Sequence, residues 1–294
     1  MFARSISDMM IKPGNSPVFG TPADYDLPFE DVTFTTDDGV TLSGWLVKGE
    51  SDKIIIQSHF GVQCSRSGFT PEGKGMIKLW KTKIPFLRHV RAFVDAGYSV
   101  LLYDFRNHGE SGTGSVPWVS WGPEEHADVL AAVRFVSEHP TYRDASVGLL
   151  SICMGAAATT YAYGKGEAGL AAFPKIEALI AVQPLLYPDF VRGLGIPGFL
   201  ASGASKVNHE RTGIDLDTMS FLPHVKDIPV PTLVIQNENA PWANRDRVQQ
   251  YFDALEVPKE MLWLDLSKDR AAAYDWLGTH PETLTAFFDE HVVP

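Results

Sequence analysis

The stretch GLLSICMGAAA at residues 148–158 decides how this chain folds. Aliphatic residues lead into it, as in a buried strand, and small residues follow it, as in a closely packed helix. Cys153 stands at the corner, with Ser151 two positions before it and Gly155 two positions after it. The spacing small-x-nucleophile-x-Gly is typical of a strained turn that raises a nucleophile above a sheet, beside the first N–H groups of a helix.

A second motif, DFRNHGESG, occupies residues 104–112 and follows an aliphatic segment. It is similar to the Asp-x-Arg-x-x-Gly-x-Ser turn of α/β-hydrolases, and the corner at Cys153 resembles the Gly-x-Cys-x-Gly turn of their dienelactone-hydrolase-like branch. The chain therefore resembles the α/β-hydrolase superfamily over residues 30–291. The resemblance implies a mostly parallel, twisted sheet with helices on both faces. It also implies that Asp104 and Arg106 tie their turn together beneath the site.

The alternation of strand-like and helix-like segments predicts one α/β domain over residues 1–294. Residues 1–28 are rich in Pro, Gly and Asp, and we expect an irregular arm on the domain surface. Residues 184–228 mix glycines with apolar side chains at the place where this fold carries a cap, so we expect a mobile, apolar lid there. The remaining expected elements are a hairpin over 30–47, strands at 53–58, 98–103, 176–182, 231–236 and 260–266, and helices at 86–96, 123–138, 244–255 and 281–291, with loops at 62–85 and 267–280.

Composition narrows the class of protein. The net charge of −11 over 294 residues argues against nucleic acid and anionic membrane surfaces as partners. Cys64 and Cys153 are too few for a disulfide framework and are interpreted as free thiols in a reducing compartment. No secretory signal or membrane-spanning run is visible, so a cytoplasmic enzyme is expected. No cluster has the spacing of metal ligands or of a phosphate loop, and no cofactor or metal is expected.

Acyl transfer needs a nucleophile, a base that activates it and donors for the oxyanion. Cys153 is the predicted nucleophile, and its alternative interpretation is a buried small hydrophobe, the usual state of a free cysteine. The resemblance places an oxyanion loop after the strand at 53–58, where the chain reads His59-Phe60-Gly61. The amide N–H groups of Met154 and Phe60 are therefore the predicted oxyanion hole.

The other two members of a triad depart from the family pattern. The resemblance implies an acid after the strand at 231–236 and a histidine after the last strand. Ala240 occupies the expected acid position and Asp269 the expected histidine position. Glu238 and His280 are the remaining candidates in these two loops. Their alternatives are a solvated loop acid and an ordinary residue at a helix start.

These residues favour a cysteine-nucleophile hydrolase that cleaves an ester, lactone or thioester through an acyl-enzyme intermediate. The altered acid and histidine positions leave open an acyltransferase, a lyase or a cyclase of a biosynthetic pathway, and a non-enzymatic binding protein. The apolar cap predicts a small-molecule apolar acyl substrate. A homodimer is a candidate assembly. Trp118 and Trp121, close after the 104–112 turn, are candidates for the substrate wall or for the core.

Overall fold

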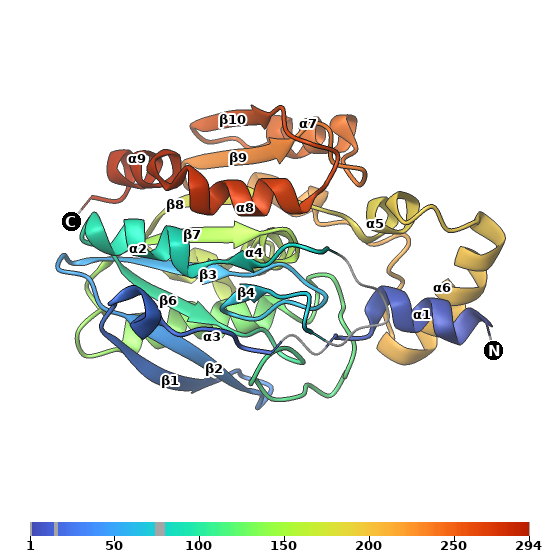
Figure 1. The fold of residues 1–294 in the computed structure, drawn as a ribbon, viewed down its shortest axis with the longest axis horizontal. Coiled ribbons are helices and arrows are strands. Elements are labelled where there is room, and N and C mark those ends of the chain that lie inside the picture. The colour runs from blue at the N-terminus through green and yellow to red at the C-terminus, as the bar shows by residue number, and fades with distance from the viewer. Residues whose placement is uncertain (1, 15–16, 74–79, 294) are drawn as a thin grey trace.

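The computed structural model describes residues 2–14, 17–73 and 80–293 (Figure 1). Its centre is an eight-stranded sheet with the order β1-β2-β6-β3-β7-β8-β9-β10. The first three strands in this order pair antiparallel and all the others pair parallel. The strands are β1 (Phe29–Thr35), β2 (Thr41–Val47), β3 (Lys53–Ser58), β6 (Ser99–Tyr103), β7 (Ser146–Ile152), β8 (Ile176–Val182), β9 (Thr232–Asn237) and β10 (Lys259–Leu264).

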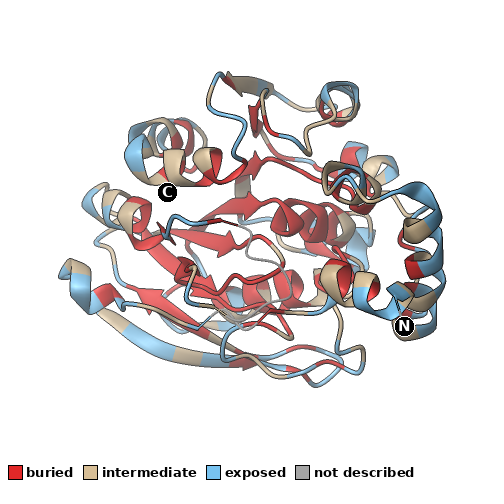
Figure 2. Cartoon of the chain, turned by 45° about the vertical axis from the view of Figure 1, so that its right-hand side comes forward, coloured by how far each residue is buried: buried red, intermediate tan, exposed pale blue. Residues whose placement is uncertain are grey.

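The middle of the sheet is buried on both faces, which explains the continuous aliphatic runs of the central strands (Figure 2). Every residue of β7 is buried, and Ser58 at the end of β3 pairs with Ser151 of β7. Because these strands run parallel, their carboxyl ends meet at one edge. The segment after β3 and the corner at Cys153 therefore lie side by side.

Helices cover both faces of the sheet, as the sequence predicts (Figure 1). Contacts among α2, α8 and α9 join one layer, and α3 packs against α4 in the other. Gly148 lies against the ring of Phe288, 2.7 Å from where a Cβ would stand, so α9 packs directly on β7. The helices are α2 (Leu87–Asp95), α3 (His126–Glu138), α4 (Met154–Tyr163), α7 (Arg245–Ala254), α8 (Ala271–Thr279) and α9 (Pro281–His291).

Two predicted loops contain regular structure. Residues 267–280 include helix α8, which the good helix formers Ala271, Ala272 and Ala273 begin. Within 62–85, β4 (Gly68–Phe69) pairs antiparallel with β5 (Ile84–Pro85), and residues 74–79 of this loop lie outside the described part.

The amino-terminal arm is helical rather than irregular over α1 (Phe2–Ile11). It packs side by side with α6 (Gly198–Thr212), which belongs to the segment between β8 and β9 together with α5 (Tyr187–Gly193) (Figure 1). Met10 is fully buried, and Arg211 of α6 forms an ion pair of 2.8 Å with Asp8. Helix α1 therefore packs against α6 of the cap segment, residues 184–228. In the described residues no helix has the length and apolar character to cross a membrane.

Candidate active site

Cys153 occupies a strained corner between β7 and α4. Its backbone angles are φ +55° and ψ −103°, a region that residues with a side chain rarely adopt. The turn is tight because α4 lies directly against the end of β3: a Cβ on Gly155 would stand 2.5 Å from the carbonyl oxygen of Ser58. A glycine is therefore required two residues after the nucleophile position.

Ser151 stands where the family pattern has its first glycine. Its hydroxyl lies 2.8 Å from the Oγ1 of Thr159, one turn into α4 and also buried. Each hydroxyl satisfies the other, so the departure from glycine leaves no unpaired buried polar group.

The Cys153 side chain is 5% exposed and borders a small cavity of about 20 Å³, room for about one water molecule. The walls are largely aromatic and include Trp121 from the segment before α3 and Phe190 from α5 of the cap. The other lining residues are Phe60, Gly61, Val62, Trp80, Leu185, Trp242 and Tyr274. The thiol is thus buried beside an aromatic cavity and not among aliphatic side chains alone.

A wider groove of about 820 Å³ lies outside this cavity. Trp80 and Trp242 line both spaces and so form the partition between them. Arg270, Lys81 and Lys268 also line the groove. Asp269 lines it as well, so three basic residues and one acidic residue border the groove, on a chain whose net charge is −11.

Arg270 is the charged group beside the thiol. It is 1% exposed, and its Nη2 donates to the Cys153 Sγ at 3.6 Å and to the carbonyl oxygen of Gln183 at 2.7 Å. Its Nε donates to the Tyr274 hydroxyl at 2.8 Å. Burial alone would lower the pKa of Arg270, but Tyr274 and Cys153 hold it above its ordinary value. Among the described residues, no carboxylate forms an ion pair with this guanidinium.

Tyr274 completes the polar surroundings of the sulfur. It lines the same cavity as Cys153, and its hydroxyl accepts the Arg270 Nε–H at 2.8 Å. Burial raises the pKa of Tyr274 well above its ordinary value, although Arg270 opposes this. The phenol therefore keeps its proton at neutral pH.

The predicted relay residues are not brought to Cys153, which corrects both assignments. His280 is exposed at the junction of α8 and α9, where its ring stacks on Trp276 and its Nδ1 meets the Thr279 hydroxyl at 2.9 Å. Because α8 begins beside the site and runs away from it, His280 is carried about 15 Å along the helix from Arg270. Glu238 is also exposed and pairs with Arg245 at 3.1 Å.

No imidazole in the described ranges hydrogen-bonds to Cys153. His59, in the loop after β3, accepts the Phe105 N–H at Nε2 and meets the Phe60 carbonyl at Nδ1, and burial lowers its pKa to about 3. Sequence reasoning missed Arg270 because it sought a histidine. Its position was the one available hint, because Arg270 directly follows Asp269, the place expected for the histidine.

The residues predicted for the oxyanion hole lie next to each other. A Cβ on Gly61 would stand 2.7 Å from the Met154 sulfur, so the loop after β3 rests on the start of α4. Met154 is the first helical residue, and its N–H has no partner within the helix. Assignment of the Phe60 and Met154 amides as oxyanion donors stays a prediction.

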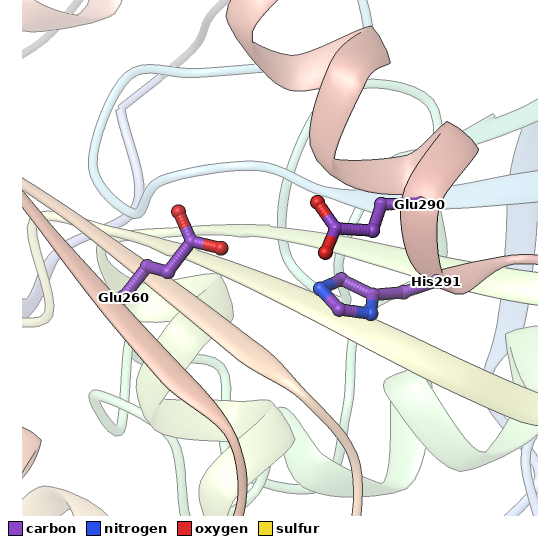
Figure 3. Close-up of side chains that lie close together, drawn as sticks. All are labelled: Glu260, Glu290 and His291. Carbon is purple, nitrogen blue, oxygen red and sulfur yellow. The ribbon is translucent and has the colours of Figure 1, made fainter.

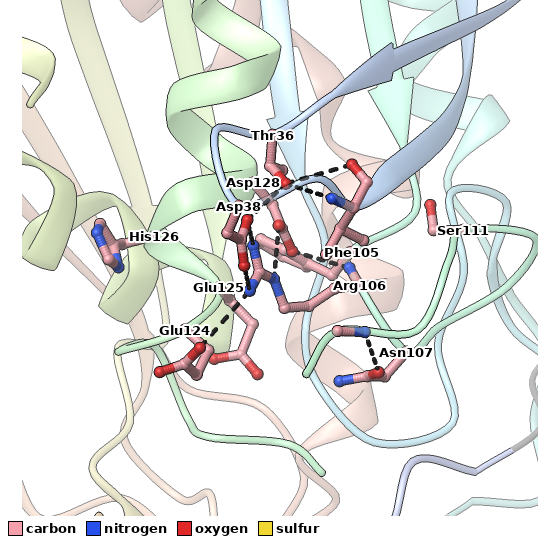
Figure 4. Close-up of polar contacts among 12 residues, drawn as sticks. Thr36, Asp38, Phe105, Arg106, Asn107, Ser111, Glu124, Glu125, His126 and Asp128 are labelled. Carbon is pink, nitrogen blue, oxygen red and sulfur yellow. Dashed lines mark hydrogen bonds and ion pairs between the residues drawn. The ribbon is translucent and has the colours of Figure 1, made fainter. Parts of the chain in front are cut away.

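Buried ion pairs fix the turn at residues 104–112 below this edge of the sheet (Figure 4). Arg106 donates from Nε to Asp128 at 2.8 Å and from Nη1 and Nη2 to Asp38 at 2.8 and 2.9 Å. Asp104 pairs with Arg66, from the loop after β3, and accepts the Glu110 N–H at 2.9 Å. The turn thereby anchors the loop that carries Phe60.

One further cluster has potential metal-binding groups. Glu260, Glu290 and His291 place one ligand atom each within 4.8 Å of one another, although their sequence spacing gives no sign of it (Figure 3). Both glutamates are exposed. Glu260 lies near the start of β10, so the cluster is at the opposite edge of the sheet from Cys153 and takes no part in this site.

The sheet order, the strained corner after the fifth strand of the sheet and the helical layers define an α/β-hydrolase fold. Solved structures with this fold include an esterase from Pyrococcus furiosus, with a TM-score of 0.71, 22% identity and coverage of 96% of this chain and 100% of that one. They also include a dienelactone hydrolase from Anabaena variabilis, with a TM-score of 0.56, 14% identity and coverage of 91% and 99%. The predicted fold class is confirmed.

Two curated proteins are similar in sequence. A polyketide transferase from a Penicillium species is 27% identical over 242 residues, which are 78% of this chain and 72% of the relative. A thiohydrolase from Aspergillus aculeatus is 28% identical over 165 residues, 55% of this chain and 43% of the relative. No protein-family profile matches the chain.

Proposed function

We propose that this protein is a hydrolase or acyltransferase of ester or thioester bonds in which Cys153 is the nucleophile. The observation that carries the proposal is the position of Cys153 at a φ of +55°, beside a cavity and at the start of a helix. Strain of this kind is retained where the surrounding structure enforces it, typically at functional sites. The similar polyketide transferase and thiohydrolase support acyl chemistry.

In the first half-reaction the Cys153 sulfur attacks the acyl carbonyl carbon. A C–S bond forms, and the carbonyl π electrons move to the oxygen, which the Met154 and Phe60 amides stabilise. Collapse restores the C=O bond and expels the original alcohol or thiol group, leaving a thioester on Cys153. In the second half-reaction another nucleophile bonds to the acyl carbon, and the C–S bond breaks with its electron pair on the Cys153 sulfur. The proton that the nucleophile loses restores the thiol in the overall reaction.

The substrate is proposed to be an apolar acyl compound, because aromatic side chains surround the sulfur. The cavity is too small for such a group, so the walls must move when it binds. Phe190 belongs to α5, and a Cβ on Gly193 of the same helix would stand 1.6 Å from the Trp242 ring. Displacement of α5 would therefore release Trp242 from the partition, and we propose that the cap segment opens in this way.

The test is intact-mass spectrometry after mixing with a panel of acyl thioesters and p-nitrophenyl esters. Wild type and Cys64→Ala are expected to gain one acyl group and to turn over, whereas Cys153→Ala gains none. Cys64 is a matched control because it is also a buried free cysteine, and burial raises the pKa of its thiol well above the ordinary value. Turnover in folded Cys153→Ala equal to that of wild type would exclude a cysteine nucleophile.

A further inference from the structure

We propose that Arg270 replaces the general base of the site as the partner of a Cys153 thiolate, and that the enzyme exchanges acyl groups between thiols. This inference rests on the proposed function, since it assumes an acyl group on Cys153. It goes further because it specifies the donor and the acceptor. Three features of the structure carry it.

The first feature is a buried cation without a carboxylate partner. Arg270 is 1% exposed, and in the described ranges its hydrogen-bond partners are the Gln183 carbonyl, the Tyr274 hydroxyl and the Cys153 sulfur. A buried charge is costly unless an opposite charge compensates it. Of the three partners, the sulfur is the one whose reactive form is an anion, because the thiolate is the nucleophilic form of a cysteine. A Cys153 thiolate would therefore supply the negative charge that compensates the buried Arg270 guanidinium.

The second feature is that the sulfur has no proton acceptor among the described residues around it. Guanidinium remains protonated in proteins, and the raised pKa of Tyr274 keeps the phenol protonated. The other residues that line the cavity have aliphatic or aromatic side chains or none. A water or alcohol molecule must lose a proton as it attacks a thioester, and a positioned base normally accelerates this step by about 10²–10⁴-fold. The site provides no such base.

The third feature is where the cation lies. Arg270 contacts the sulfur and also lines the groove outside the aromatic partition. An anion that enters through the groove therefore approaches the residue whose guanidinium faces Cys153. Lys81 and Lys268 on the groove add to the attraction for an incoming anion, and Asp269 offsets part of it.

Exchange between thiols meets these constraints without any proton transfer. The Cys153 thiolate attacks a donor thioester, a C–S bond forms, and the donor sulfur leaves with the bonding pair as a thiolate. An acceptor thiolate then attacks the acyl-enzyme, and Cys153 leaves as a thiolate. One negative charge is present at every stage, and Arg270 faces it throughout. An alkyl ester is a poor acyl donor for this mechanism. Its leaving alkoxide needs a proton, and the described residues around the sulfur include no proton donor stronger than Tyr274.

The test follows the acyl-enzyme formed from a hexanoyl thioester of N-acetylcysteamine, after removal of excess donor. Its decay is measured by intact-mass spectrometry in buffer alone, with a millimolar small thiol and with an equal concentration of an alcohol. We expect decay with the thiol to exceed decay in buffer by at least about tenfold, and the alcohol to have no effect. Decay in buffer as fast as with the thiol would overturn the inference while leaving the cysteine mechanism intact.

Variants at Arg270 give an independent readout. Arg270→His introduces a proton acceptor, and we expect its acyl-enzyme to hydrolyse at least about tenfold faster in buffer than that of wild type. Arg270→Lys keeps a cation and should keep the preference for thiol over water. Arg245→Gln, a change at an exposed arginine, is the control and should match wild type. An Arg270→Lys enzyme that prefers water would contradict the inference. If no donor acylates Cys153 in wild type, the proposed function fails, and this inference fails with it.

Discussion

Removal of the charge at Arg270 should make Cys153 less reactive at neutral pH. With Nη2 3.6 Å from Sγ and an effective dielectric constant of about 20, Coulomb attraction to a thiolate reaches about 4–5 kcal/mol. A hydrogen bond to a charged group has a smaller measured value of about 1.5–3 kcal/mol. Using the smaller value, Arg270→Gln removes about 1.5–3 kcal/mol of stabilisation from the anionic, reacting form of the sulfur. Because a more basic thiolate is also a better nucleophile, the alkylation rate should fall by only about threefold to tenfold.

The assay is the rate at which iodoacetamide labels Cys153, read from peptide masses, with Cys64 in the same molecule as the internal reference. Measurements at about pH 7 and about pH 10 separate charge from access, since a free thiol is largely ionised at the higher value. We expect the deficit of the Arg270→Gln variant to be smaller at pH 10 than at pH 7. An equal deficit at both pH values would mean that the variant changes only access to the cavity. No deficit at either would refute the electrostatic reasoning.

Three other predictions follow from the corrected site and the packing around it. His280→Ala and Glu238→Gln should each keep turnover within about twofold of wild type, since both side chains are exposed and away from the sulfur; a tenfold loss in either would restore it as a relay candidate. Gly155→Ala should lower the free energy of unfolding, measured in urea, by about 1–3 kcal/mol, because the added Cβ meets the Ser58 carbonyl oxygen. Gly198→Ala is the control, since a Cβ there meets open space. Equal stability of the two variants would show that the corner relaxes. Burial lowers the pKa of His89 to about 3, so the folded protein keeps its ring neutral, whereas the unfolded chain binds a proton below about pH 6.5. The contribution of His89 to the free energy of unfolding is therefore complete above pH 6.5 and falls by about 2 kcal/mol at pH 5. His89→Gln should remove that part of the pH dependence in urea unfolding, and an unchanged pH 7 to pH 5 difference would contradict it.

The parts of the fold that follow local rules were predictable. Asp37-Asp38-Gly39 predicts the hairpin, and Gly39 indeed adopts a φ of +87° in the turn between β1 and β2. The strained corner was readable for the same reason: its glycine, its small residues and its nucleophile must stand at fixed spacings. Such constraints act over a few residues and leave a trace in the sequence.

Features that depend on distant partners were not predictable. Helix α1 is held by α6, nearly 200 residues away, so residues 2–11 give little sign of it when read alone. The partner of Cys153 was also hidden, because an arginine beside Asp269 resembles a solvated loop residue. Its role arises only when tertiary packing encloses it with Tyr274 and the sulfur. The sequence therefore predicted the strained corner at Cys153 but not the arginine that contacts its sulfur.

The contact between α1 and the cavity wall has a practical consequence. The Met10 carbonyl accepts a hydrogen bond of 3.3 Å from the indole of Trp121, and the Ile11 carbonyl accepts one of 2.8 Å from the Val119 amide. A shortened protein that begins after Ile11 would lose both hydrogen bonds, which hold the backbone next to the cavity wall at Trp121. Protein prepared for kinetic work therefore needs α1 intact.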